Sequence, residues 1–366
     1  MDMRNAFEKI VSDLVAIPSP SGKEEQVSDY VFECLRREGC DPCRDSDGNV
    51  WTQLGPSTEK ILHLNCHLDT VVPGEGWETD PWCPVVKGDL LFGLGSSDCK
   101  GGVAAMLLLA PMVRPKVRTL FSFTVCEEGG GKKENGSRKM AARGGTWAVT
   151  VEPSCAPYGV CASVGTQGHA LAVVRFAGKS AHSSRPELGE NAVSAASRFI
   201  LAVDRQNGLF KEAEVYPGVC ARPSVAVTLI SGGRLSNVIP DSCEVTVSRR
   251  LAPGETEETF RRELDALLAG EKASYEVRCD GPCAVADTNG ILFSAVRRAL
   301  KEVTGQERFG FQRGRTDAVI YAGRGMDTIT LGPGQSGQSH CPNEHINLTV
   351  AEQCVRVLEH LVNELA

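Results

Sequence analysis

Apolar positions recur at helical spacing in the first part of the chain. Residues 3–16 and 24–38 show this period, and a Pro-Ser-Pro-Ser-Gly segment at 18–22 stops the first of them. Longer apolar runs typical of buried strands then alternate with helical segments. The strands are expected at 60–72, 117–128 and 146–153, and the helices at 101–113 and 134–144. This alternation predicts an α/β sheet with helices on both faces.

The pattern changes after about residue 165. A strand, a helix, two strands, a helix and a last strand are expected at 169–178, 189–206, 224–233, 243–251, 255–270 and 273–281. This β-α-β-β-α-β order is the ferredoxin-like signature. The earlier pattern returns with helices at 290–304, near 316–323 and from about 349, and a strand at 327–333. The sequence therefore predicts an α/β domain with a mixed sheet, residues 1–165 and 284–366, interrupted by a smaller inserted domain, residues 166–283.

Composition and charge exclude several functions. The chain has 366 residues, 42% of them hydrophobic, and 39 Lys and Arg against 46 Asp and Glu give a net charge of −7. A negative chain is a poor partner for nucleic acid or an anionic membrane. The N-terminus lacks the apolar core of a signal peptide, and Pro111 and Arg114 end the longest apolar helix. We therefore expect a soluble cytoplasmic protein with no nucleic-acid or membrane partner.

Cysteine is abundant but follows no framework. The 15 Cys are odd in number and scattered, which fits reduced thiols in a reducing compartment. Cys66, Cys99, Cys126 and Cys341 each adjoin a chemically interesting residue, so a thiolate ligand or redox switch is one interpretation. Small core fillers are the preferred one, because neighbours on a strand point to opposite faces.

Imidazole and carboxylate groups collect where expected strands end. His67 and Asp69 end one strand, Glu127 and Glu128 end the next, and Asp98, Glu152 and His340 lie at further junctions. Ligands bind at such strand ends in open α/β sheets. Nitrogen and carboxylate ligands suit zinc-like ions, and a carboxylate can bridge two of them. Two metals together can polarise an amide carbonyl.

Local arguments assign finer roles to these residues. Asp69 can accept the second N–H of the His67 imidazole if both lie on one strand face. If a strand continues through Glu127 and Glu128, their side chains point to opposite faces, so one can bind metal while the other takes a proton. Two simpler interpretations stay open: Asp98 capping the helix expected from Gly101, and Glu152 merely ending a strand.

Taken together, the motifs resemble the dinuclear-zinc amidohydrolases and exopeptidases that include acetylornithine deacetylase, succinyl-diaminopimelate desuccinylase, the aminoacylases and glutamate carboxypeptidase. The resemblance covers nearly the whole chain. It lies in HLDTV, GLGSSDCKGG, CEEGGG, VEPS, SAHSSRPELGENA, NVIPD and a late GQSH followed by Glu344, all in the family's order.

The resemblance implies a ligand set and a mechanism. Asp98 would bridge two divalent ions, zinc or else cobalt or manganese. His67 and Glu152 would complete one site, and Glu128 and His340 the other. Glu127 would be the general base that activates the bridging water. His182, in the inserted lid domain, would reach the partner subunit's site in a homodimer formed through that domain. Asn237 and Arg250 would hold substrate.

Substrate class is the open point. Glu152 stands where the family's deacylases tend to carry Glu and many of its peptidases Asp. We therefore expect hydrolysis of the amide bond of an N-acyl amino acid, of the deacetylase or desuccinylase type. The alternatives are a carboxypeptidase or dipeptidase acting on short peptides, and a non-catalytic relative that binds a metabolite or protein. Cys99, Ser248 and His345 depart from the family pattern, which leaves pocket shape and lid contacts open.

Overall fold

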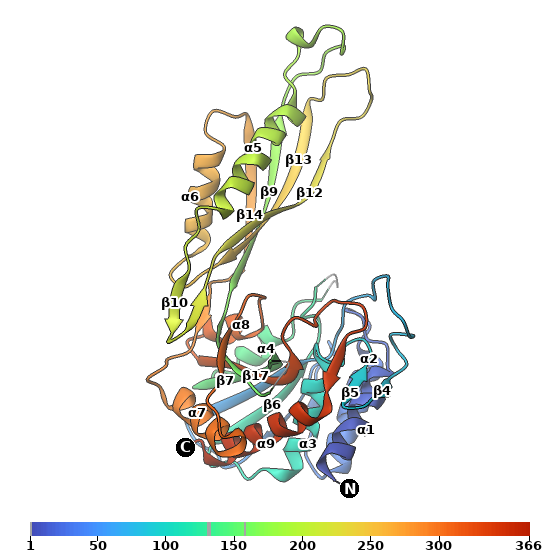
Figure 1. Cartoon of the computed structure of the whole chain (residues 1–366), viewed down its shortest axis with the longest axis vertical. Helices are drawn as coiled ribbons and strands as arrows, with labels where there is room; N and C mark the ends of the chain where they lie inside the picture. Colours follow the sequence, from blue (N-terminus) through green and yellow to red (C-terminus); the bar gives the residue numbers. More distant parts are fainter. Residues whose placement is uncertain (1, 130–132, 157–158) are drawn as a thin grey trace. The chain divides into compact units, whose positions relative to one another are not determined.

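A nine-stranded mixed sheet forms the centre of the first part of the fold (Figure 1). The computed structural model describes residues 2–129, 133–156 and 159–366. In spatial order the strands are β1 (Cys43–Arg44), β2 (Val50–Leu54), β6 (Arg118–Thr124), β3 (Ile61–His67), β7 (Trp147–Cys155), β17 (Asp327–Gln335), β8 (Ala162–Thr166) and β15 (Ala284–Val285), and β16 (Phe309–Gln312) pairs with β8. Strands β6, β3, β7 and β17 run parallel to their neighbours in this group. Their carboxyl ends therefore meet at one edge of the sheet.

Helices cover this sheet in two groups (Figure 1). One group consists of α1 (Met3–Val15), α3 (Lys100–Met112), α7 (Ile291–Thr304) and α9 (Leu348–Glu364), with α2 (Glu25–Arg37) packed against α3 and β2. The other is α4 (Ser137–Ala141) and α8 (Ala318–Ala322). Helix α3 comes very close to the sheet: a Cβ added to Gly102 would lie only 2.0 Å from the carbonyl oxygen of Val151. That close approach requires glycine.

A second, three-stranded sheet brings distant segments together. Its order is β18 (His345–Asn347), β5 (Leu90–Phe92) and β4 (Val85–Lys87), all antiparallel. His345 pairs with Phe92, so the loop that follows β5 lies beside the loop that precedes β18. These two loops carry Asp98 and His340.

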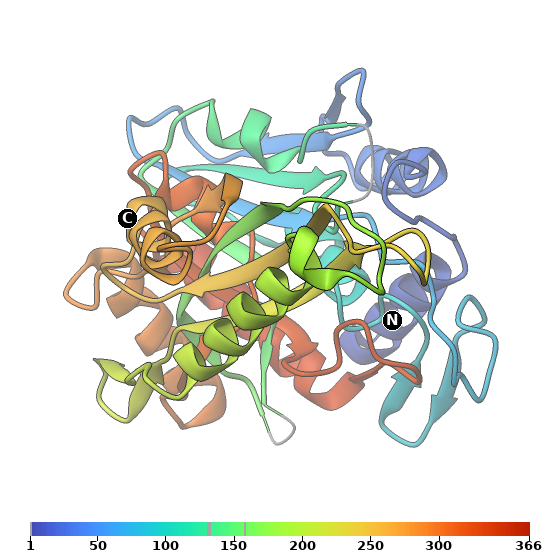
Figure 2. The ribbon, with the colours of Figure 1, turned by 90° about the horizontal axis from the view of Figure 1, so that it is seen from above.

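The inserted part forms its own unit, Gln167–Ala284 with Arg313–Arg315. Its elements are β9 (Gly168–Ala177), the short 3-10 helix Pro186–Leu188, α5 (Ala192–Asn207), β12 (Ser224–Gly232), β13 (Ser242–Leu251), α6 (Glu257–Leu267) and β14 (Ala273–Gly281), with a hairpin of β10 (Ala213–Tyr216) and β11 (Val219–Ala221). The antiparallel sheet has the order β12-β13-β9-β14, and α5 and α6 pack on it (Figure 2). Alternate residues of β9, such as Ala172 and Val174, are buried against the helices.

The fold class expected from the sequence is confirmed: a mixed α/β sheet flanked by helices, interrupted by a smaller β-α-β-β-α-β unit. Several bounds differ. Strands β3 and β6 end at His67 and Thr124, earlier than expected. The helix expected at 134–144 is only the shorter α4, and the Asn135 side chain accepts the N–H of Ser137 just before it. The short strands β1, β2, β4, β5, β8 and β18 were not anticipated, since two to five residues carry no readable period.

Among the residues that the structure describes, no helix is long and apolar enough to cross a membrane.

Candidate metal centre

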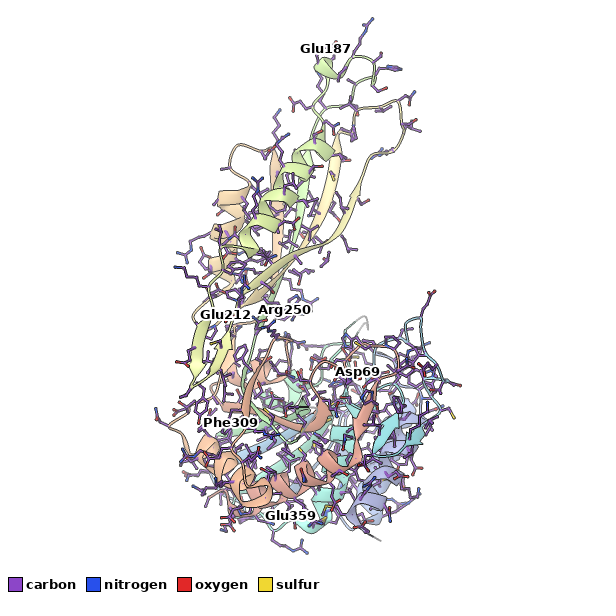
Figure 3. All side chains as sticks on the ribbon, in the orientation of Figure 1. Asp69, Glu187, Glu212, Arg250, Phe309 and Glu359 are labelled. Atoms are coloured by element: carbon purple, nitrogen blue, oxygen red, sulfur yellow. The ribbon has the colours of Figure 1, made fainter. Side chains whose placement is uncertain are left out.

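The candidate site lies where the parallel strands end. His67 is the last residue of β3, and Asp69 follows it at the same edge, far from Glu359 of α9 at the opposite end of this unit (Figure 3). Both side chains are almost completely buried. The Nδ1 atom of His67 lies 2.9 Å from the backbone oxygen of Asp69 and 3.6 Å from its carboxylate. The Nδ1 proton is therefore held by the Asp69 residue, and Nε2 faces the site.

The Asp69 carboxylate has other partners. It accepts the backbone N–H groups of Glu127 and Glu128, each at 3.0 Å, and the hydroxyl of Ser21 at 2.6 Å. The strand does not continue through the two glutamates as the alternation argument required. Strand β6 ends at Thr124, and Cys126 adopts a positive φ of 61°. A turn held by Asp69, rather than strand alternation, positions both glutamates.

Five of the expected residues have side-chain atoms that converge. Three overlapping groups each place one potential ligand atom per residue within 4.8 Å of the others. They are His67 with Asp98 and Cys99, His67 with Glu127 and Glu128, and Asp98 with Glu128 and His340. Asp98 and Glu128 each share one group with the buried His67 and another with the exposed His340. Such shared carboxylates suit two neighbouring cations.

Two direct contacts link the imidazoles to the carboxylates. His67 Nε2 is 3.0 Å from an Asp98 oxygen, and His340 Nε2 is 2.8 Å from a Glu128 oxygen. Helix α3 begins at Lys100 with Cys99 at the N-cap position, so Asp98 does not cap it as the simpler interpretation proposed. The Asp98 carboxylate is directed to His67 instead.

Burial and mutual charge perturb this cluster. Burial, reinforced by the charge of Asp98, raises the pKa of Glu128. Burial alone would lower the pKa of His67, but the Cys99 thiol and the carboxylates of Asp69 and Asp98 raise it well above its usual value. The other Glu128 oxygen, Oε1, is buried and has no hydrogen-bond partner. Closely placed carboxylates and an orphaned buried oxygen fit a site for divalent cations, which would supply the missing positive charge.

Glu152 lies within β7, which continues to Cys155, so it does not end the strand as the simpler interpretation proposed. One of its oxygens accepts the N–H of Asp317 at 2.9 Å. Burial and the charge of Asp317 raise the pKa of Glu152 to about 8, and His67 and Asp98 are its other charged neighbours. Glu152 belongs to none of the three groups of converging ligand atoms. The charges of His67 and Asp98 nevertheless act on its pKa, so Glu152 belongs to the same electrostatic environment.

Three supporting residues carry no assigned role in the sequence analysis. Asp317 lies behind Glu152, where it accepts a hydrogen bond from Asn135 at 2.7 Å. Glu344 is 1% exposed and accepts three backbone N–H groups of the loop that carries Asp98. Lys100 is fully buried, donates to the Ile17 oxygen at 2.7 Å, and has its pKa lowered by burial to about 7. In the sequence, Glu344 follows the late GQSH motif and Lys100 lies within GLGSSDCKGG, whereas Asp317 lies in no motif.

The remaining expected residues belong to the inserted unit. His182 is exposed, its Nδ1 lies 2.8 Å from the Ser184 hydroxyl, and its backbone bridges to Val238. The backbone oxygen of Asn237 accepts the N–H of Ser183 at 2.9 Å, so Asn237 and His182 lie on adjoining loops. Arg250 is on β13, opposite Ser224 of β12 and His169 of β9.

All 15 cysteines are free. Cys66, Cys99 and Cys126 are buried, in agreement with their interpretation as core fillers, and the sulfurs of Cys66 and Cys99 lie 3.0 Å apart. The same interpretation is wrong for Cys341, which is exposed, because it lies in a loop where strand alternation does not apply.

The fold and the carboxylate and imidazole cluster define a metal-dependent hydrolase. Residues 63–364 match the profile of peptidase family M20/M25/M40, and the chain belongs to this family. As a member of this family, the protein is a metal-dependent hydrolase acting on amide bonds.

Relatives cover the full length of the chain. A succinyl-diaminopimelate desuccinylase of Thioalkalivibrio sulfidiphilus is 27% identical, and the alignment covers 100% of this chain and 99% of that protein. An M20 family metallo-carboxypeptidase of Sulfolobus solfataricus has a similar structure, with a TM-score of 0.80, 16% identity and 99% coverage of each chain. A dinuclear metal-binding M20 peptidase of Bacillus subtilis has a TM-score of 0.72 at 18% identity, covering 100% of this chain and 99% of its own.

Proposed function

We propose that the protein hydrolyses the amide bond of an N-acyl amino acid, with two divalent ions and with Glu127 as general base. The observation that carries this proposal is the convergence of His67, Asp98, Glu128 and His340 around shared ligand positions, with Glu127 beside them. Asp98 would bridge the ions, His67 and Glu152 would complete one site, and Glu128 and His340 the other. Zinc suits this ligand set, and cobalt or manganese can replace it.

The bound ions would supply Lewis-acid polarisation of the scissile carbonyl. The protein residues supply the rest. Glu127, held through its backbone by Asp69, takes a proton from the attacking water and returns it to the leaving amine. A Glu127→Gln variant keeps the side-chain shape but cannot accept this proton. We expect it to lose turnover by about 10²- to 10⁴-fold while it still binds zinc; unchanged turnover would show that Glu127 is not the general base.

Three observations bear on the substrate class, and they point in two directions. The Thioalkalivibrio relative is named for desuccinylation, and Glu152 occupies the position expected of deacylases. The Sulfolobus structure is a carboxypeptidase, which supports the second candidate, cleavage of short peptides. A panel of N-succinyl and N-acetyl amino acids against dipeptides, assayed with zinc, cobalt and manganese, separates them. We expect the acyl amino acids to be cleaved faster; cleavage of dipeptides alone would reject the deacylase proposal.

The proposal includes a homodimer formed through the inserted unit. Strand β12 is at the edge of its sheet, a position where strands can pair with another chain. Leu229 and Ile230 on this strand are 68% and 54% exposed. An edge strand with exposed apolar side chains suits pairing with a second copy. His182 would then stabilise the oxyanion in the partner's site, and Asn237 and Arg250 would hold the substrate carboxylate.

The molecular mass of the protein in solution tests the proposed homodimer. Sedimentation equilibrium should give a dimer for the wild type. A Leu229→Lys, Ile230→Lys variant should be monomeric, because two charges cannot be buried in an apolar contact. Matched substitution of Val86, which is exposed in the other unit, should leave the dimer intact. A wild-type monomer at assay concentration would remove His182 from the proposed mechanism.

A further inference from the structure

The loop that carries Asp98 is held from behind by one buried carboxylate. Glu344 Oε1 accepts the N–H of Ser97 at 2.9 Å and of Asp98 at 2.8 Å, and Oε2 accepts the N–H of Gly95 at 2.8 Å. The backbone oxygen of Glu344 also accepts the N–H of Gly93 at 3.0 Å. Four hydrogen bonds therefore fix a single short loop to one residue that is distant in sequence.

Glu344 also connects the two imidazole sites. It follows His340 in the same segment, which is anchored at its far end where His345 pairs with Phe92. The Asp98 side chain contacts His67, and His340 contacts Glu128. A displacement of Glu344 would therefore move the bridging Asp98 and the segment of His340 relative to each other.

We propose that Glu344 is a positioning residue for the metal centre, whose carboxylate sets the backbone of Asp98 so that the aspartate can contact both ligand groups. This inference rests on the proposed metal-binding function, to which it adds a residue that touches neither metal nor substrate. Groups of this kind that orient metal ligands typically contribute about 10- to 100-fold to metal affinity.

A structural alternative must be separated from this role. Lys100 is also fully buried, and a negative charge on Glu344 would favour its protonated form. Glu344 could therefore serve only to balance the charge of Lys100. Removing one member of a buried pair leaves the other uncompensated, whereas removing both is often tolerated. A variant without either charge distinguishes charge balance from positioning.

The experiment measures zinc affinity and stoichiometry by competition with a chromophoric chelator, with the visible spectrum of the cobalt-loaded protein as a second readout. Glu344→Gln removes the charge, and Glu344→Asp keeps the charge but shortens the side chain by one methylene. Both should weaken zinc binding by about 10- to 100-fold and alter the cobalt spectrum. The Glu344→Gln, Lys100→Met double variant should recover melting temperature but not zinc affinity.

Asp45→Asn is the matched control. Asp45 Oδ1 also accepts three backbone N–H groups, those of Asp47, Gly48 and Asn49, but in a turn that carries no proposed ligand. The Asp45→Asn variant should bind zinc with the affinity of the wild type. Wild-type zinc affinity in Glu344→Asp, or its return in the double variant, would overturn the positioning role. If the single variants do not fold, the double variant decides. Absence of zinc binding by the wild type would instead reject the proposed function.

Discussion

The carboxylate of Asp69 accepts the backbone N–H of Glu127 at 3.0 Å. Its other oxygen accepts the N–H of Glu128 at the same distance, while the backbone oxygen of Asp69 lies 2.9 Å from Nδ1 of His67. One residue thereby sets the orientation of a proposed ligand and of the turn that carries both the proposed base and a second ligand. We propose that Asp69 acts on the reaction through these residues.

Asp69→Asn tests this role. An amide retains one acceptor oxygen but turns an NH₂ group toward a backbone donor, so one glutamate N–H loses its partner. We expect kcat/KM to fall by about 10- to 100-fold with the protein still folded. Ser21→Ala is the control, because it removes only the hydroxyl donor to the same carboxylate. Equal activity in the two variants would contradict the assignment.

The proposed action of His182 in trans predicts complementation between inactive variants. A Glu127→Gln subunit supplies an intact His182, and a His182→Ala subunit supplies an intact Glu127. In a random mixture half of the dimers are mixed, and each mixed dimer has one complete site, so activity should recover to about a quarter of the wild type. The measurement is turnover after unfolding and co-refolding the two variants. No recovery from dimers of confirmed mixed composition would rule out action in trans.

The inserted unit has an acid-sensitive contact. The hydrogen bond with His169, 3.0 Å long, is the main cause that lowers the pKa of Asp280 to about 2, from an ordinary value of 3.8. Because the pKa is lower in the folded state, ionised Asp280 stabilises the fold above about pH 4, and this contribution is lost as pH falls toward about 2. It amounts to at most about 2 kcal/mol.

Urea unfolding of the wild type and of Asp280→Asn measures this difference. The wild type should be the more stable protein at pH 6, and its advantage should shrink by about half at pH 3. Asp265→Asn, an exposed acid of the same unit that accepts the Tyr275 hydroxyl, serves as control. A difference between wild type and Asp280→Asn that does not change with pH would show that the contact does not depend on the charge.

Thiol chemistry should be separable from activity. Cys66 and Cys99 are fully buried, whereas Cys43, Cys83, Cys220 and Cys341 are exposed. Because Cys341 adjoins His340, alkylation there would crowd the site, and a Cys341→Ser background removes that complication. In this background we expect iodoacetamide to leave turnover intact and phenanthroline to abolish it. The reverse result would favour a redox sensor over a metal-dependent hydrolase.

The sequence predicted those parts of the site that follow from periodicity. His67 could be placed because a long buried run ends at it, and parallel strands bring such ends to one edge. Glu152 was expected near the end of a similar run, which continues to Cys155. The inserted unit could be predicted because its strands and helices are long. Short strands were missed, among them β18 and β5, although their pairing brings His340 and Asp98 together.

Supporting contacts could not be predicted for a different reason. The bond between Asp69 and the N–H of Glu127 depends on where β6 ends and on the positive φ of Cys126, neither of which leaves a periodic signal. Glu344 reaches a loop 249 residues away in the sequence. A backbone N–H can donate to a side chain whatever the residue types of its loop are. The sequence of the donor loop therefore gives no pattern from which such a hydrogen bond could be predicted.

Turnover against zinc equivalents tests the central claim most directly. The protein is stripped with phenanthroline, and hydrolysis of an N-succinyl amino acid is measured while zinc is added stepwise. Two ions per subunit are predicted: the stripped protein should be inactive, and activity should rise until about two equivalents are bound. Turnover that survives complete removal of metal, or that does not return at any zinc concentration although the protein remains folded, would contradict the account.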